Sequence, residues 1–259
     1  MAARGVRELN LISQDTTYYG KDRGAADGLA RLIEKLVSVP GLEWIRVLYG
    51  YPEEITPGLL DAFGDSKVCP YLDIPFQHSD PGIVRRMGRG MDETRALKLI
   101  ERIRKRIPDI SLRTSLIVGF PGEGTREFRG LQRFVKEARF THLGVFAYSS
   151  EPGTAAGALG DPVSPEEKER RRDVLMKLQA GISLANNRRL VGRRVDVVVD
   201  GPARKSGAFI GRTMSQAPEV DGVVFVHRAG RIPAKPAGIV RQVEITAAGV
   251  YDLRGEWHP

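Results

Sequence analysis

The chain has 259 residues, a length that suits one large domain or two unequal ones. Hydrophobic residues make up 41% and charged residues 28%, the ordinary balance of a globular protein, which excludes a collagen-like or wholly disordered chain. No apolar run approaches the roughly 18 residues of a membrane-spanning helix, so we expect no membrane partner.

The net charge of +8 is compatible with a nucleic-acid or ribosomal partner, although many arginine-rich proteins bind no nucleic acid. Cys69 is the single cysteine. One thiol cannot form an intrachain disulfide, a zinc-finger site or a cysteine-ligated iron–sulfur cluster. The sequence therefore predicts no metal site and a structural role for Cys69.

Strand-like and helix-like segments alternate along the first 190 residues. The apolar patterns predict strands at 6–13, 44–49, 71–74, 111–118 and 142–148, and helices at 27–39, 57–64, 92–107 and 125–138. Strands separated by helices indicate βα units and a parallel sheet.

The strongest helix signal begins at Ser164. There a hydroxyl stands at the N-cap, Pro165 at the first helical position and Glu167 at the third, which together form a capping box. We expect this helix to run to about Arg189.

After residue 190 the pattern changes to five short strands, at 195–199, 208–213, 223–226, 238–245 and 251–255. Such spacing is typical of a small antiparallel barrel of the OB type. Residues 188–259 hold 12 basic and 7 acidic residues, so we expect RNA contact here, although a solvated surface also explains the charge.

The predicted fold is therefore α/β, with three segments. A partial β/α barrel, incomplete at its N-terminus, occupies 1–160, a linking helix occupies 161–189, and a small all-β barrel occupies 190–257.

Four polar clusters follow predicted parallel strands, at 13–16, 73–78, 119–123 and 148–151. Sites of β/α barrels assemble at the carboxyl ends of the strands, so four successive clusters indicate a common mouth.

Single residues within these clusters allow more than one interpretation. Gln14 and Asp15 suit an amine or hydroxyls, but a turn cap explains Asp15 equally well. Gln77 suits an amide or a base edge. We interpret His78 as a turn residue rather than a metal ligand, because no second histidine or cysteine lies nearby in the sequence.

Arg113 is the one charge inside an apolar strand. Strand alternation places it on the barrel's interior face, where a guanidinium needs an anionic partner. A ligand carboxylate or an acid such as Asp15 or Glu123 would serve. The 119–122 turn, Gly-Phe-Pro-Gly, would let the backbone approach a ligand closely, but it lacks the spacing of a dinucleotide or P-loop motif.

Three stretches together resemble the methylthiotransferases of the radical S-adenosylmethionine (SAM) superfamily. They are Leu-Ile-Ser-Gln-Asp-Thr at 11–16, Tyr-Leu-Asp-Ile-Pro-Phe-Gln-His at 71–78 with Arg-Met-Gly-Arg at 86–89, and Ile-Val-Gly-Phe-Pro-Gly-Glu at 117–123. The Ser13–Thr16 sequence is closer to the ribosomal-protein branch than to the tRNA branch. Segments 211–222 and 251–256 resemble that branch's TRAM domain.

The resemblance implies a cytoplasmic enzyme that places a methylthio group on the β-carbon of an aspartate in a small-subunit ribosomal protein. SAM bound at a 4Fe–4S cluster would be cleaved reductively, the resulting radical would abstract hydrogen, a second cluster would supply sulfur, and another SAM would supply the methyl group. It also implies that Gln14, Asp15, Gln77, Arg113 and Glu123 line the SAM and substrate mouth. The Arg113 guanidinium would then bind the SAM carboxylate. No residue is assigned a catalytic role.

The sequence departs from the family in its cysteines. The family holds one cluster on a Cys-x3-Cys-x2-Cys loop, placed shortly before the position of Met1, and another on three cysteines of an earlier domain; neither set is present. Gly124 also replaces the family's usual threonine. We therefore expect an N-terminally truncated member that is inactive alone.

Two other interpretations remain open: a tRNA methylthiotransferase, and a catalytically inert binding fragment. Recognition of a tRNA anticodon arm rather than a ribosomal protein by the TRAM domain would identify the former.

Overall fold

The computed structural model describes residues 2–203, 208–228 and 238–257. Parts of the predicted barrel domain, 204–207 and 229–237, lie outside the described residues. The described helices are α1 (Gly28–Val37), α2 (Pro57–Ala62), α3 (Pro81–Arg86), α4 (Glu93–Arg106), α5 (Thr125–Ala138) and α6 (Pro165–Arg188). The described strands are β1 (Glu8–Leu11), β2 (Trp44–Val47), β3 (Val68–Asp73), β4 (Ser111–Val118), β5 (His142–Ala147), β6 (Arg194–Pro202), β7 (Phe209–Thr213), β8 (Val224–Arg228), β9 (Val240–Ala248) and β10 (Leu253–Trp257).

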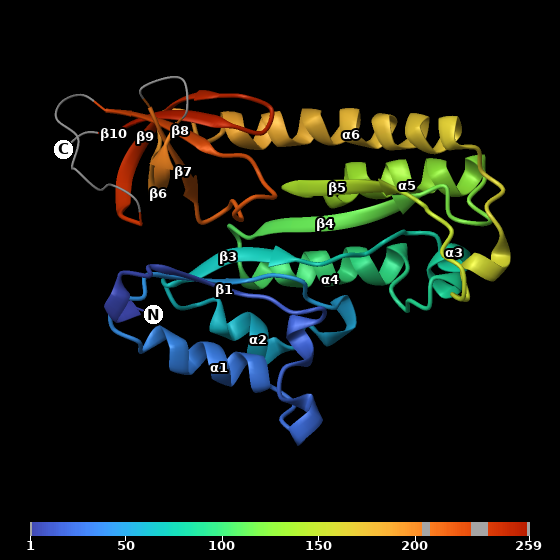
Figure 1. Ribbon diagram of the computed structural model, residues 1–259, viewed down its shortest axis with the longest axis horizontal. Coiled ribbons are helices and arrows are strands. Elements are labelled where there is room, and N and C mark those ends of the chain that lie inside the picture. The colour runs from blue at the N-terminus through green and yellow to red at the C-terminus, as the bar shows by residue number, and fades with distance from the viewer. Residues whose placement is uncertain (1, 204–207, 229–237, 258–259) are drawn as a thin grey trace.

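The first half of the chain forms a five-stranded parallel sheet in the order β1-β2-β3-β4-β5 (Figure 1). Leu112, Leu116 and Val118 of β4 are buried in the apolar core that the sheet shares with the helices. Arg113, Ser115 and Ile117 alternate with them on the other face and stay partly exposed. The predicted partial β/α barrel is confirmed, and its interior face carries the polar side chains.

The predicted helices follow from local capping as well as from apolar spacing. The Ser164 hydroxyl accepts a hydrogen bond from the Glu167 backbone N–H, with Pro165 at the first position of α6. Asp92 caps α4 in the same way, through the N–H of Arg95. α6 packs along β5 and α5 rather than only linking two domains (Figure 1). The domain limits at 160 and 189 stay a prediction.

Helix α3 is an element that the sequence patterns above did not predict. Asp80 accepts hydrogen bonds from the backbone N–H groups of Gly82 and Ile83, and Pro81 occupies the first turn. An aspartate followed by proline is a helix-start signal, so the sequence contained the information.

The C-terminal strands close into a barrel in the order β10-β8-β7-β6-β9, with β9 pairing β10. One pair, β8 with β10, is parallel, so the prediction of a wholly antiparallel barrel is wrong in this detail. The reason is geometric: strand direction cannot alternate all the way around a closed ring of five strands, so at least one pair must be parallel.

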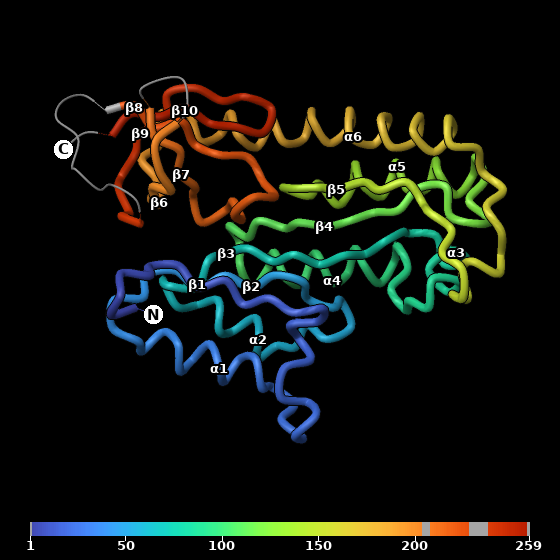
Figure 2. The backbone as a smooth tube through the Cα atoms, viewed as in Figure 1, coloured from blue at the N-terminus to red at the C-terminus, as the bar shows by residue number. Residues whose placement is uncertain are grey.

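The barrel packs against the end of the sheet where β3, β4 and β5 begin. Trp44, Cys69 and Tyr71 of the sheet form one buried apolar cluster with Val198 and Ala217 of the barrel. The start of the chain also lies at this end (Figure 2).

Buried ion pairs reinforce this junction. The Glu8 carboxylate accepts hydrogen bonds from Arg46 at 2.9 Å and from Arg212 of β7 at 2.7 Å. The carboxyl end of the sheet is left uncovered by the barrel.

Candidate functional site

A cavity of about 300 Å³ opens on the interior face of the sheet toward its carboxyl ends. Polar clusters after β1 and β3 supply Gln14 and Gln77, and β4 supplies Arg113 and Ser115. The other lining residues are Tyr49, Gly50, Tyr51, Pro75, Arg89, Ile117 and Phe146. We call this cavity the mouth pocket. Successive strand ends therefore do meet in one cavity, as β/α architecture requires.

Two residues of the mouth pocket have unusual backbone angles. Tyr49 has φ 54° and Gln77 has φ 68°, among four described non-glycine residues with positive φ. Such conformations cost about 1–3 kcal/mol and persist where the surrounding structure imposes them. Backbone hydrogen bonds to β4 hold Gln77: its N–H donates to the Ser115 carbonyl, and its carbonyl accepts from the Ile117 N–H. These hydrogen bonds hold the positive-φ conformation of Gln77, which sets the direction in which its side chain projects.

The amides of Gln14 and Gln77 make no side-chain hydrogen bond to any described residue, although both line the mouth pocket. An amide offers two donors and an acceptor. On the same wall Arg89 lies over the Tyr51 ring, 4.3 Å from guanidinium carbon to centroid. Phe146, with 55% of its surface exposed, adds an apolar face. This donor set and aromatic surface suit a polar ligand with a flat ring.

Arg113 has internal partners that the sequence did not indicate. Its Nη1 lies 3.0 Å from Asp73 of β3, and its Nε lies 3.7 Å from Asp221 of the barrel domain. The strand register sets Arg113 directly opposite Asp73, so the pair follows from sheet pairing. The suggested partners Asp15 and Glu123 are therefore wrong. Whether Arg113 also binds a ligand carboxylate stays a prediction.

Asp15 and Glu123 do not line the mouth pocket. The Asp15 carboxylate caps the 3₁₀ turn Thr16–Tyr18 by accepting from the backbone N–H and the hydroxyl of Thr17. It therefore positions the segment beside Gln14, in agreement with the turn-cap interpretation.

Glu123 lies wholly buried in an ionic cluster. Its Oε1 is 2.6 Å from Nη1 of Arg171 on α6, and its Oε2 is 3.1 Å from Nε2 of His78. The N–H of Asp80 donates to Nδ1 of His78, so the Nε2 proton of a neutral ring donates to Glu123. These contacts tie together the loops after β3 and β4 and the start of α6.

The side chains of Lys168 and Arg86 pack directly against the glycines of the turn at 119–122. A Cβ on Gly119, at φ 75°, would meet the Lys168 side chain, and one on Gly122, at φ 91°, would meet the Arg86 guanidinium. The two glycines therefore permit close packing of these two cationic side chains. The side chains occupy the space in which the sequence analysis expected a ligand to approach the backbone.

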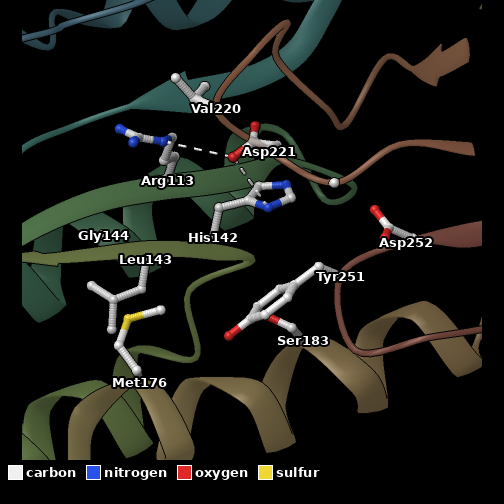
Figure 3. A pocket seen from close by; sticks show the side chains of 11 residues that line it. Arg113, His142, Leu143, Gly144, Met176, Ser183, Val220, Asp221, Tyr251 and Asp252 are labelled. Atoms are coloured by element: carbon white, nitrogen blue, oxygen red, sulfur yellow. Dashed lines mark ion pairs between the residues drawn. The ribbon is translucent and has the colours of Figure 1, made fainter. Parts of the chain in front are cut away.

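A second cavity, of about 390 Å³, lies where the barrel meets the sheet (Figure 3). Arg113 and His142 project from the sheet toward Asp221, which also accepts a hydrogen bond from the Tyr71 hydroxyl at 2.7 Å. Ser183 and Tyr251 line the other side (Figure 3). Arg113 lines this junction pocket and the mouth pocket alike, so one side chain separates the two cavities.

His142 should make stability depend on pH. Its Nε2 bonds the Ser215 carbonyl at 2.7 Å, and burial lowers its pKa below the usual 6.5 although Asp221 opposes the shift. Below pH 6.5 the unfolded chain takes up a proton that the folded chain resists, so stability should fall until the folded-state pKa is passed. Melting temperature measured from pH 8 to pH 5 should show this loss.

The matched variant is His142→Gln, whose amide can still donate to Ser215 but cannot titrate. It should flatten the decline, whereas His227→Gln, at an exposed position on β8, should leave it unchanged. An unaltered pH profile in His142→Gln would contradict the assignment.

The chain's residues do not fit an iron–sulfur cluster. Cys69 is the only cysteine; it is fully buried at the domain junction, and burial raises the pKa of its thiol to about 12. Among the described residues, no group of three or more His, Cys, Asp or Glu could hold a metal ion. The described part of the chain therefore supplies no set of ligands for such a cluster.

Comparison with known proteins agrees with this architecture. A model of the radical SAM superfamily matches residues 1–135, and a TRAM domain model matches residues 191–257. The chain belongs to the radical SAM superfamily. Coproporphyrinogen III oxidase (HemN) from Escherichia coli, a radical SAM enzyme, has a similar fold, with a TM-score of 0.56 and 18% identity over 81% of this chain and 53% of that one.

Curated relatives of high similarity are named ribosomal protein uS12 methylthiotransferase RimO. The protein from Koribacter versatilis is 46% identical over 255 residues, which cover 98% of this chain and 51% of the relative. The protein from Geobacter sulfurreducens is 47% identical over 258 residues, 99% of this chain and 57% of the relative. The chain thus spans about half the length of the curated relatives it matches. In the described part of the chain, no helix has the length and hydropathy needed to span a bilayer.

Proposed function

We propose that this chain forms the SAM-binding and substrate-binding part of a cytoplasmic methylthiotransferase that acts on the β-carbon of an aspartate in a small-subunit ribosomal protein. The observation that supports it is the match to uS12 methylthiotransferases over nearly the whole chain. The superfamily to which the chain belongs supplies radical chemistry from SAM and 4Fe–4S clusters.

In this proposal the mouth pocket binds SAM. Gln14 and Gln77 offer unengaged amides to it, and Phe146 packs against a ring. Arg113, oriented by Asp73 through Nη1, presents its remaining surface to the ligand. Asp15 and Glu123 do not contact the ligand in this proposal. They position the segments that carry the ligand-contacting groups.

To test the function, the chain is joined to the portion of the G. sulfurreducens relative that lies outside the matched 258 residues. With SAM and a reductant, this chimaera should add one methylthio group to uS12, detected by peptide mass spectrometry. Modification of tRNA instead would favour the tRNA branch.

Gln77→Leu in the chimaera and in the chain alone should weaken SAM binding about tenfold, the effect of losing a well-placed hydrogen bond to a ligand. The melting temperature should stay nearly unchanged, because the Gln77 amide has no partner among the described residues. Isothermal titration calorimetry measures the binding. Arg113→Leu is the contrast: it should lower the melting temperature, because Asp73 and Asp221 lose their cation.

The single cysteine favours a second candidate function, binding without catalysis. It would be supported if the chain binds SAM or uS12 while the chimaera transfers nothing. Absence of both binding and transfer would contradict both candidates.

A further inference from the structure

A further cavity, of about 690 Å³, lies beside the mouth pocket at the carboxyl end of the sheet. Helix α3 and the segment that follows β5 enclose it there (Figure 1). It shares four lining residues with the mouth pocket, namely Gln77, Arg89, Ile117 and Phe146. We call this cavity the outer pocket. Its volume lies within the range of ligand sites, roughly 300–1,000 Å³.

The outer pocket carries an excess of positive charge. Three arginines line it, Arg85, Arg86 and Arg89, against one acid, Glu151. Among the residues that the structure describes, none forms an ion pair or a side-chain hydrogen bond with these three guanidiniums, although several other surface arginines are paired with acids. The described part of the chain therefore leaves this charge largely without compensation.

Arg89 is held at the wall between the two cavities. Its backbone ends α3 in a Schellman motif, because Gly88 has φ 68° and the Arg89 N–H donates to the Val84 carbonyl. The guanidinium carbon lies 4.3 Å from the centroid of the Tyr51 ring, which holds the end of the side chain. Burial lowers the pKa of Arg89, so this cation is partly desolvated. Arg89 is the one cation that lines both the mouth pocket and the outer pocket.

We infer that Arg89 binds the carboxylate of the substrate aspartate, and that the peptide segment around this aspartate occupies the outer pocket. The inference rests on the proposed function, in which the reacting atom is the aspartate β-carbon. That carbon is bonded directly to the carboxyl group, so a guanidinium fork that holds the carboxylate also holds the carbon. Because Arg89 lines both cavities, the bound aspartate lies beside the ligand of the mouth pocket.

The other walls of the outer pocket suit the neighbouring residues of a peptide. They are largely apolar and include Phe120, Tyr148, Ala155 and Ala156. The Phe120 and Tyr148 rings pack edge to face, 5.0 Å between centroids. The Tyr148 hydroxyl is buried and has no hydrogen-bond partner among the described residues, so this wall also holds an unsatisfied polar group. A peptide offers both apolar side chains and main-chain hydrogen-bonding groups.

The arrangement of the charge favours a carboxylate over a nucleic-acid backbone. The three arginines lie within five positions of the sequence, at the end of one short helix, so their charge forms one compact site. A nucleic-acid backbone is bound by cations that follow it along a groove. One carboxylate, by contrast, needs one guanidinium fork.

Isothermal titration calorimetry of the intact chain with overlapping synthetic peptides that together cover uS12 tests the binding. One aspartate-containing peptide should bind, and replacing its aspartate with asparagine should weaken binding about tenfold, through loss of a charged hydrogen bond. Arg89→Gln should weaken binding of the unaltered peptide to the same extent. The asparagine peptide should bind the Arg89→Gln chain no more weakly than it binds the unaltered chain, because both changes remove the same contact.

Two further variants are the controls. Arg89→Lys keeps the charge without the fork and should recover part of the affinity. Arg129→Gln removes an exposed arginine of α5 that does not line the outer pocket, and should bind the peptide within about twofold of the unaltered chain. Equal weakening by Arg129→Gln would overturn the inference in favour of diffuse attraction. So would absence of peptide binding, equal binding of the aspartate and asparagine peptides, or Arg89-dependent binding of an oligonucleotide in place of the peptides.

The chimaera separates this inference from the proposed function. Arg89→Gln in the chimaera should raise the KM for uS12 about tenfold, because the substrate loses its anchor. Transfer with an unchanged KM would overturn the inference and leave the proposed function standing. Arg89-dependent peptide binding by a chimaera that transfers nothing would support the binding site and contradict the proposed function.

Discussion

Replacing Arg46 with alanine should lower the free energy of unfolding by about 3–5 kcal/mol, because it removes a fully buried cation and leaves the buried Glu8 carboxylate with Arg212 as its remaining partner. The Arg46 side chain is fully buried, donates to Glu8 at 2.9 Å and to the Met214 carbonyl at 2.6 Å, and lies over the Tyr71 ring. Its loss therefore removes contacts on both sides of the domain junction.

Urea unfolding of the intact chain measures the effect, since the two tryptophans report on different parts. Trp44 lies in β2 and Trp257 in β10, and both are buried. In the Arg46→Ala chain the unfolding midpoints reported by Trp44 and Trp257 should differ. The barrel domain, which holds Trp257, should unfold at the lower urea concentration. Arg106→Ala, which breaks an exposed pair with Asp61, should cost under about 1 kcal/mol. Equal losses of stability in the two variants would contradict the role assigned to the buried Arg46–Glu8 pair at the domain junction.

Glu123→Ala should cost a similar amount, about 3–5 kcal/mol, because Arg171 and His78 lose the carboxylate that joins them in the interior. Arg171 keeps a contact with Glu167, which lies nearer the surface, so part of its charge stays compensated. Glu123→Gln retains an acceptor oxygen and should recover part of the loss.

Thermal unfolding of these two variants is compared with Glu169→Ala, whose partner Arg172 is exposed. Glu169→Ala should change stability by under about 1 kcal/mol. A Glu123→Ala chain as stable as the Glu169→Ala chain would show that the buried cluster is not needed for the fold.

Local signals predicted most of the elements. The strand at 111–118 and the helix at 125–138 match β4 and α5 at both ends, because apolar spacing delimits both segments and Gly119 and Gly124 mark the end of the strand and the start of the helix. The same patterning predicted the polar interior face of β4 that carries Arg113.

Partnerships between distant segments were harder to predict. Arg113 lies near Asp221 only because the barrel domain packs against the end of the sheet where β3, β4 and β5 begin, and no local sequence pattern encodes that docking. Glu123 seemed suited to the mouth because it follows a strand, but α6 returns across that loop and captures it through Arg171. Strand-end position identifies which residues gather at one edge of a sheet; it does not tell which of them another helix will bury.

The two sheets differ in whether they have an edge strand with unpaired main-chain N–H and C=O groups. The five-stranded barrel is closed, so each of its strands has a neighbour on both sides. In the parallel sheet, β1 has β2 as its one strand neighbour within the described residues, and all four of its residues are partly exposed. A row of main-chain amide and carbonyl groups on its outer side is therefore open to water or to an added strand. The outer edge of the first strand is therefore suited to edge-to-edge association of two chains as the protein concentration rises.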